Sequence, residues 1–310
     1  MLNYLPVTLG QLRTFLKVAE TGSIAGAAAA LVVTEPSVSA AVAALRRELG
    51  ADLIERAGRG IRLTEAGHEL ALHATDILGL VQSARRSVAE AAGGPRHVRL
   101  VAVTTAGEYV LPPILGAFFD THPGVQVSLE VGNRSDAIAR LVARDADIAV
   151  GGRPPAESGI AGEAFLENHL VVVGRSDHPL RDRRALQPRV LARETWLLRE
   201  PGSGTRATTE EFFASNDIQP AAVMTIGSNG AVKEAAVVGL GVTLISSHAV
   251  ARELADGRLA RLDVRGTPLR RAWYALYRDG SRLSKSTALF LNYLMTEDHP
   301  HPTDAGPARP

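Results

Sequence analysis

The chain has 310 residues, of which 45% are hydrophobic and 5% aromatic, so it can form two or three domains with cores of small aliphatic side chains. It contains no cysteine, which excludes disulfides, thiolate metal sites and cysteine catalysis. The formal net charge of +1 says little about nucleic acid, because a small DNA-binding module needs only a local basic patch. No apolar run approaches the ~18 residues of a membrane span, and the N-terminus lacks the pattern of a secretory signal. We therefore expect a soluble, cytoplasmic protein that contacts no membrane.

Residues 1–65 predict a winged helix-turn-helix, an arrangement that places one helix in a DNA groove. Apolar residues at helical spacing indicate the buried stripe of a first helix: Leu9, Leu12, Phe15, Leu16 and Ala19. Ser23 is placed to cap a second helix over 24–31, and Thr34 to cap a third, whose first turn tolerates Pro36. The third helix has its own inward stripe: Val38, Ala41, Val42, Leu45 and Leu49.

The start of this third helix should present its outward residues to base edges, among them Ala40. Strands at 53–55 and 61–63 then flank the turn AGRG, and the arginines of this hairpin would lie along phosphates. The candidate DNA-binding residues are Ser23, Thr34, Glu35, Pro36, Ser37, Ser39, Arg56, Arg59 and Arg62. The alternative is a three-helix bundle with a solvated basic loop; the tight turn and the arginine-bearing hairpin favour DNA.

A long helix should follow, capped by Thr64 and running from Glu65 to about Ala91, which makes 66–92 a linker. It carries an apolar stripe that a small domain would not bury alone: Leu70, Ile77, Leu78, Val81 and Val88. Such a stripe usually pairs with another helix, so a homodimer is expected; burial against the same chain is the alternative. Gly93, Gly94 and Pro95 end the helix at a flexible joint.

From residue 97 the pattern alternates between strand and helix, which predicts a parallel sheet with helices on its faces. The expected strands are 97–105, 126–133, 147–152, 169–174, 195–200, 223–228 and 241–246, and the expected helices are 109–124, 136–144, 204–216 and 231–240; the segment 270–278 then leads back to the first lobe. The pattern repeats, so residues 95–298 should form two α/β lobes, 95–165 plus about 268–298 and about 166–267, with a ligand cleft between them. The polar, proline-rich tail at 299–310 should be disordered.

Polar side chains at the strand-to-helix turns are the candidates for lining this cleft: Thr104, Thr105, Asn133, Arg134, Gly151, Arg153, Ser203, Thr205, Arg206, Ser228 and Asn229. Free backbone N–H groups and the helix dipole meet at such turns, so they suit a carboxylate or a phosphate. The alternative is that Thr104, Ser203 and Ser228 only cap their own helices. Taken together, the set favours a small anionic ligand.

Three segments, QLRTFLKVAETGSIAGAA, VTEPSVSAAVAAL and ELGADLIERAGRGIRLTEAG, resemble the N-terminal domain of LysR-type transcriptional regulators in order and spacing. The resemblance implies a linker helix and a two-lobed effector domain like that of periplasmic binding proteins. The fold class expected is therefore α/β plus all-α. It also implies a dimer or tetramer that binds double-stranded DNA, contacts RNA polymerase and uses no cofactor beyond a small-molecule co-inducer.

Further segments, VTTAGEYVLPPILGAFFDTHPGVQVSLEVGN, REPGSGTRATTEEFF and IGSNGAVKEAAVVGLGVTLIS, look most like regulators of carbon-fixation (RuBisCO) operons. Related regulators of sulfur metabolism share similar segments. This narrower resemblance implies that the co-inducer is a phosphorylated or otherwise anionic metabolite.

Two residues depart from the family pattern, which usually has Gln in place of Glu35 and often Arg or another polar group in place of Ala40. A glutamate accepts a hydrogen bond from cytosine N4, whereas a glutamine pairs bidentately with adenine. We therefore expect the hairpin arginines to supply affinity and Glu35 to set the sequence preference. Arg59→Ala should weaken binding across sequences and flatten its salt dependence.

Two other classes of function are less well supported. For an enzyme, PGSGT lacks the full G-x-S-x-G pattern, and GLG at 239–241 lacks the third glycine of a dinucleotide fingerprint. Asp145 and Asp147 fall where a helix yields to a strand, and His299 and His301 lie in the expected tail, so no catalytic residue or metal site is predicted. A solute-binding or catalytic α/β protein with an accessory helical domain remains the alternative.

Overall fold

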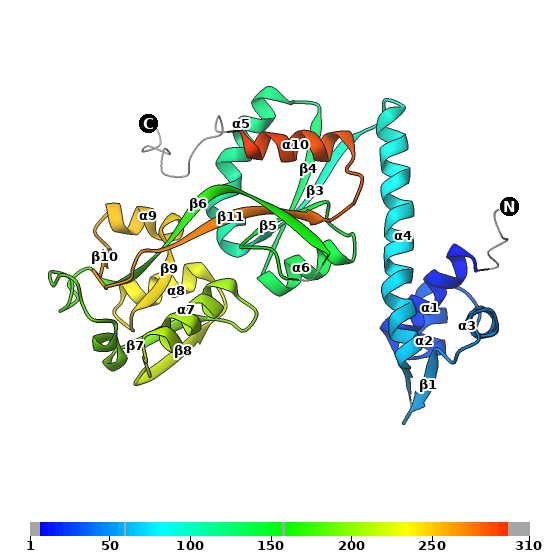
Figure 1. The fold of residues 1–310 in the computed structure, drawn as a ribbon, viewed down its shortest axis with the longest axis horizontal. Helices are drawn as coiled ribbons and strands as arrows, with labels where there is room; N and C mark the ends of the chain where they lie inside the picture. The colour runs from blue at the N-terminus through cyan, green and yellow to red at the C-terminus, as the bar shows by residue number, and fades with distance from the viewer. Residues whose placement is uncertain (1–6, 59, 157–158, 297–310) are drawn as a thin grey trace. The chain divides into compact units, whose positions relative to one another are not determined.

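The computed structural model describes residues 7–58, 60–156 and 159–296 (Figure 1). The chain divides into two compact units, residues 1–92 and 93–310. Arg59 and the tail at 299–310, with His299 and His301, lie outside the described residues. In the described ranges no single helix is both long and apolar enough to cross a membrane; α2 and α3 pass that test only as a pair bent by 111°.

The first unit is helical apart from one hairpin, and its elements follow the predicted order. They are α1 (Leu9–Thr21), α2 (Ile24–Leu31), α3 (Glu35–Leu49), β1 (Ile54–Ala57), β2 (Gly60–Leu63) and α4 (Glu65–Ala91). Side-chain caps define several of the boundaries: the Ser23 hydroxyl accepts a hydrogen bond from the Gly26 N–H at 2.9 Å. Thr34 stands at the N-cap of α3, but its hydroxyl hydrogen bonds the Ser37 hydroxyl at 2.8 Å and caps no backbone N–H.

The core of this unit confirms most of the predicted helical stripes. Buried positions at helical spacing are Leu12, Phe15 and Val18 on α1 and Val38, Val42 and Leu45 on α3. The predictions for Leu9 and Leu49 are wrong, because each lies in the terminal turn of its helix with its side chain exposed. Gly67 on α4 must be glycine, since a Cβ there would meet the Leu53 carbonyl oxygen at 1.9 Å.

Helix α4 has the predicted bounds, and Thr64 caps it by accepting from the Gly67 N–H at 3.0 Å. Its apolar residues, however, divide between two faces. Leu70 and Leu78 pack on the core of the first unit, whereas Ile77 and Val88 are exposed together with Leu72 and Leu80. The exposed apolar residues are the ones that a homodimer through α4 would bury. The residues packed on the first unit fit the alternative, in which the stripe is buried against its own chain.

The second unit is built on a seven-stranded sheet. Its strands are β3 (Arg96–Val103), β4 (Val125–Gly132), β5 (Ile148–Gly151), β6 (Ile160–Arg175), β9 (Thr243–Ser246), β10 (Leu259–Arg261) and β11 (Leu269–Arg278). The order is β10-β6-β11-β5-β3-β4, with β9 also paired to β6. Only β3–β4 and β3–β5 are parallel, so the expectation of a parallel sheet is wrong for the rest. The reason is that β6 and β11 are long strands that pair antiparallel with each other across the whole unit (Figure 1).

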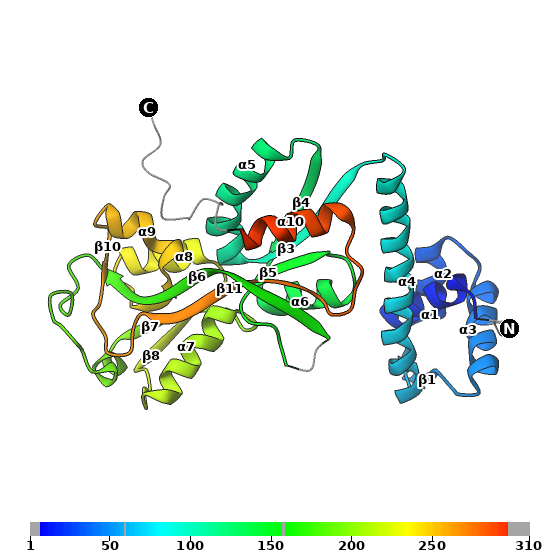
Figure 2. The same cartoon turned by 45° about the horizontal axis from the view of Figure 1, so that its top comes forward.

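Helices cover both faces of this sheet, and β7 (Thr195–Arg199) and β8 (Ala222–Ile226) form a separate parallel pair. The helical segments are η1 (Ala106–Val110), α5 (Leu111–Thr121), α6 (Arg134–Val142), η2 (Pro188–Arg193), α7 (Gly204–Ser215), α8 (Asn229–Val237), α9 (Ser247–Ala255) and α10 (Lys285–Met295). Alternation along β3 sends Leu100 toward α5 and α10, and Val101 toward α6. A second core surrounds Trp196 and Phe212, which gives the unit two lobes joined by β6 and β11 (Figure 2).

Candidate functional site

The N-terminal part of α3 presents one exposed polar face. Glu35, Pro36, Ser37, Ser39 and Ala40 are all exposed, while the residues between and after them that face the core are buried. The predicted DNA-reading residues of this helix therefore share a surface. Ser23 differs from them, because it is partly buried and its hydroxyl is engaged in capping α2.

The hairpin arginines are not equivalent. In the register of β1 and β2, Glu55 lies opposite Arg62 and Arg56 opposite Ile61, so Arg56 and Arg62 project from different faces. The Arg62 Nε donates to the Glu55 Oε1 at 2.7 Å, which neutralises that arginine locally. Arg56 is exposed, and no carboxylate of the described residues pairs with it.

The first unit has no overall positive charge. Residues 1–92 contain nine Lys or Arg and nine Asp or Glu. Several of these cations already have partners: Arg46 pairs with Asp52 at 2.5 Å, and Lys17 pairs with Glu20. The cations of this unit that lack a carboxylate neighbour are therefore the ones whose charge is free to attract a polyanion such as DNA.

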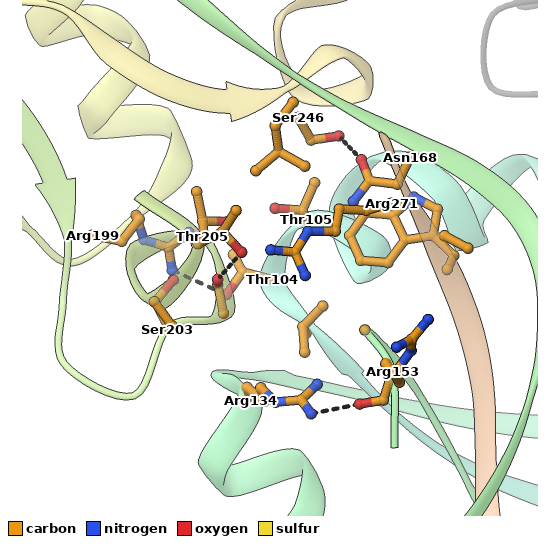
Figure 3. A pocket seen from close by; sticks show the side chains of 18 of the residues that line it. Thr104, Thr105, Arg134, Arg153, Asn168, Arg199, Ser203, Thr205, Ser246 and Arg271 are labelled. Carbon is orange, nitrogen blue, oxygen red and sulfur yellow. Dashed lines mark hydrogen bonds between the residues drawn. The ribbon is translucent and has the colours of Figure 1, made fainter. Parts of the chain in front are cut away.

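The second unit contains a cavity of about 560 Å³ between its lobes (Figure 3). Predicted residues that line it are Thr104, Thr105, Asn133, Arg134, Arg153, Ser203 and Thr205. Asn133 and Ser203 are the N-caps of α6 and α7, so the positive ends of two helix dipoles meet at the cavity. The expectation that strand-to-helix turns converge is confirmed for these residues.

Four predicted residues do not line the cavity. Gly151 is buried in β5, paired with Tyr274, and Ser228 only caps α8 by accepting from the Ala231 N–H. The Arg206 guanidinium donates to the Glu210 carboxylate at 2.8 Å and to the Arg199 carbonyl oxygen at 3.1 Å. Asn229 is fully buried behind the cavity wall. At these turns the residues cap a helix, form other hydrogen bonds or are buried in the core, and do not face the cavity.

The cavity also contains residues that the sequence reasoning missed, most of them from strands. They include Asn168, Leu170, Arg199, Glu211, Ser246, Arg270, Arg271 and Trp273. Asn168 and Arg271 face each other in the β6–β11 register. The segment RRAWYALYR begins with two adjacent arginines. They could have indicated the cavity, because two neighbouring cations on a largely apolar strand need an anion or water beside them.

Arg199 connects the lobes at the back of the cavity. Its guanidinium donates to both oxygens of Glu200, at 2.8 and 3.0 Å, and to Thr104 Oγ1 at 3.3 Å. It also donates to Asn229 Oδ1, and the Asn229 amide donates to Thr105 Oγ1 at 3.0 Å. Its charge is thus already neutralised, and its role is to hold β3 of one lobe against β7 and α8 of the other.

Arg134 and Arg153 carry charge that no carboxylate of the described residues offsets. The Arg134 Nη2 donates to the Arg153 carbonyl oxygen at 2.5 Å, which fixes the side chain beside the cavity (Figure 3). Burial lowers the pKa of Arg134, yet an arginine stays protonated at neutral pH. Two unpaired guanidinium groups beside two helix N-termini give this wall of the cavity the chemistry to hold an anion.

Comparison with known proteins decides the family. Residues 9–68 match the bacterial regulatory helix-turn-helix protein, lysR family, and residues 91–298 match the LysR substrate binding domain. The chain belongs to the LysR family. The resemblance seen in its sequence segments is therefore confirmed, and this LysR regulator combines a DNA-binding helix-turn-helix with an effector-binding domain.

The narrower resemblance is confirmed by curated relatives. The chain is 40% identical over 287 residues to the RuBisCO operon transcriptional regulator of Acidithiobacillus ferrooxidans, covering 93% of each chain. It is 38% identical to the HTH-type transcriptional activator CmpR of Synechocystis, covering 94% of this chain and 96% of the relative. These relatives are transcriptional regulators.

Solved structures support the same architecture. The CcmR regulatory domain of Synechocystis PCC6803, in complex with 2-PG, is 36% identical with a TM-score of 0.61, covering 64% of this chain and 95% of that one. Full-length CbnR, complexed with its target DNA, has a TM-score of 0.63 at 24% identity, covering 93% of this chain and 98% of CbnR. At that identity the likeness to CbnR shows the shared fold.

Proposed function

We propose that this LysR regulator responds to a small phosphorylated carboxylate, such as 2-phosphoglycolate, bound in the cavity between its lobes. The observation that carries the proposal is the pair of unpaired guanidinium groups, Arg134 and Arg153, beside the N-termini of α6 and α7. The CcmR domain, which binds 2-PG, is similar in sequence to this region of the chain. A cavity of about 560 Å³ has room for an anion of that size.

The proposed division of labour follows the three parts of the chain. Residues 1–65 bind DNA, residues 66–92 join copies of the chain through the exposed face of α4, and residues 95–298 bind the effector in two lobes, 95–165 with 268–298 and 166–267. On the DNA side we propose that the exposed face of α3 reads bases, with Glu35 setting the preference, and that Arg56 and Arg59 contact phosphates.

Ligand binding must favour one arrangement of the lobes for the signal to reach DNA, because a ligand with equal affinity for both arrangements shifts nothing. We propose that this shift changes how subunits pack, and with it DNA bending and contact with RNA polymerase. Since chromosomal DNA is the target, the protein acts in the cytoplasm. We propose no catalytic step, in keeping with relatives that are transcriptional regulators.

The proposal is tested by mobility shift and footprinting of the full chain on the DNA just upstream of its own gene, with and without 2-phosphoglycolate. We expect a long protected region containing an inverted repeat, whose footprint changes with the metabolite. Specific DNA binding whose footprint does not change with any anionic metabolite would contradict only the effector proposal. No specific binding at moderate salt would contradict the assignment of the α3 face.

A further inference from the structure

The cavity that we assign to the effector contains one carboxylate of its own. Glu211, on the third turn of α7, is the sole acidic residue among the described residues that line it. Its Oε2 accepts a hydrogen bond from the Arg271 Nη2 at 2.7 Å. An acid at a site that recognises anions is costly for binding, so its presence needs a reason.

The position of Arg271 shows what Glu211 blocks. Arg271 comes from β11, opposite Asn168 of β6, and its side chain extends into the cavity between Thr105 and Arg134 (Figure 3). The Asn168 Oδ1 already accepts from the Ser246 hydroxyl at 2.7 Å. The guanidinium of Arg271 is therefore a second place for an anion, separate from the wall formed by Arg134 and Arg153, and Glu211 occupies it.

The ion pair can open at low cost. The Arg271 side chain is 46% exposed and the Glu211 side chain 66% exposed, so the carboxylate is well solvated before and after it leaves. A ligand carboxylate that takes its place on Arg271 replaces one carboxylate by another. A ligand with a single anionic centre, by contrast, would need only Arg134 and Arg153 and would leave the pair intact.

We propose that Glu211 is a resident competitor for Arg271, which a ligand with a second anionic centre must displace, and that it thereby lowers the advantage of such ligands over those with one anionic centre. The inference rests on the proposed function, since it requires an anion to bind in this cavity. It assigns Glu211 a role in selectivity, whereas Arg134 and Arg153 supply the affinity common to all anions.

The neighbouring acid on the same helix gives a matched control. Glu210 also pairs with an arginine, accepting from the Arg206 Nε at 2.8 Å, but it does not line the cavity. Successive residues on a helix point about 100° apart, so Glu210 and Glu211 face different surroundings. Glu211→Gln and Glu210→Gln remove the same charge from the same helix, and only the first frees Arg271.

The test is calorimetric titration of the full chain and its variants with 2-phosphoglycolate and with inorganic phosphate. We expect Glu211→Gln to tighten 2-phosphoglycolate by about two- to fivefold, the range of an exposed ion pair. The gain for inorganic phosphate should be smaller, and Glu210→Gln should change neither. In an Arg271→Gln background, the gain from Glu211→Gln should be lost.

Three outcomes would overturn the inference while leaving the proposed function intact. Weaker binding by Glu211→Gln would mean that Glu211 positions Arg271 for the ligand. If Glu211→Gln tightened the binding of 2-phosphoglycolate and of phosphate equally, Glu211 would act only through its general negative charge. If Glu211→Gln and Glu210→Gln had equal effects, Glu211 would have no specific role. If neither the wild-type chain nor any variant binds either probe, the anion site itself is wrong and the inference falls with it.

Discussion

Both units present arginines to the anions that we propose they bind, but under different conditions. In the first unit, the exposed hairpin carries Arg62 already paired with Glu55, and the unit has equal numbers of positive and negative residues. In the second unit, Arg134 and Arg153 stand unpaired beside a cavity where two helices begin. An arginine whose charge is not offset by a neighbour can bind an anion without first displacing a carboxylate.

The difference also sets how strongly each unit should depend on single residues. Charges on the hairpin are surrounded by water and salt, which screen them and divide binding among several weak contacts. Arg134 is partly desolvated and held by the Arg153 carbonyl, so the proposed ligand would form charge-assisted hydrogen bonds there at little further cost in entropy. We therefore expect larger effects in the cavity than on the hairpin.

The largest effect should come from Arg134→Ala. Loss of a hydrogen bond to a charged group is worth about 2 kcal/mol, which corresponds to about thirtyfold weaker binding of 2-phosphoglycolate. Calorimetric titration measures it. The matched control is Arg140→Ala on the same helix, since Arg140 pairs with Glu130 at 2.6 Å and does not line the cavity. Similar losses for both variants would refute the assignment of the cavity wall.

A smaller effect is expected on the DNA side from Glu35→Gln. A glutamate accepts from cytosine N4 and a glutamine pairs with adenine, so the variant should shift the preference at one base position from cytosine to adenine. A good bidentate contact is worth about 1–3 kcal/mol, so the ratio of affinities for the two bases should change by about tenfold. Binding to a randomised operator library measures this ratio. An unchanged preference would show that Glu35 does not contact a base.

The sequence was sufficient to predict α1 to α8 and several residues at their starts, because caps and periodicity are local signals, but α9 and α10 were not predicted. Thr64, Asn133 and Ser203 each mark a helix start that the structure confirms. Asn133 and Ser203 also reach the cavity, although the strands before them, β4 and β7, belong to different sheets, because the cavity lies between the two lobes.

The residues that strands contribute to the cavity could not be predicted from local sequence signals. Arg271 and Asn168 enter it because β11 pairs with β6 over more than a hundred residues of sequence separation, and the period of a strand does not reveal its partner. The pairing of Arg62 with Glu55 could have been predicted from the sequence. A short turn at AGRG sets the hairpin register, and that register places the two residues opposite each other.

The hairpin itself provides the next comparison, between two arginines with and without a partner. Arg56→Ala should weaken DNA binding by about fivefold per DNA-binding unit and reduce the slope of log affinity against log salt by about one, because one phosphate contact is lost. Arg62→Ala should cost about twofold at most, since Glu55 already neutralises its charge. Fluorescence anisotropy over a series of salt concentrations distinguishes them. Equal losses would mean that Arg62 leaves Glu55 when DNA binds.

The smallest effect should be a gain, from Glu55→Gln. Removing this carboxylate frees Arg62 and takes a negative charge away from the phosphates, so DNA affinity should rise by about twofold. Glu20→Gln controls for net charge, because Glu20 pairs with Lys17 on α1 in the same unit. In an Arg62→Ala background the gain should fall to that of the control. A gain that depends on Arg62 would match the proposed competition of Glu211 for Arg271 in the cavity, whereas a gain that persists without Arg62 would mean that Glu55 repels the phosphates directly.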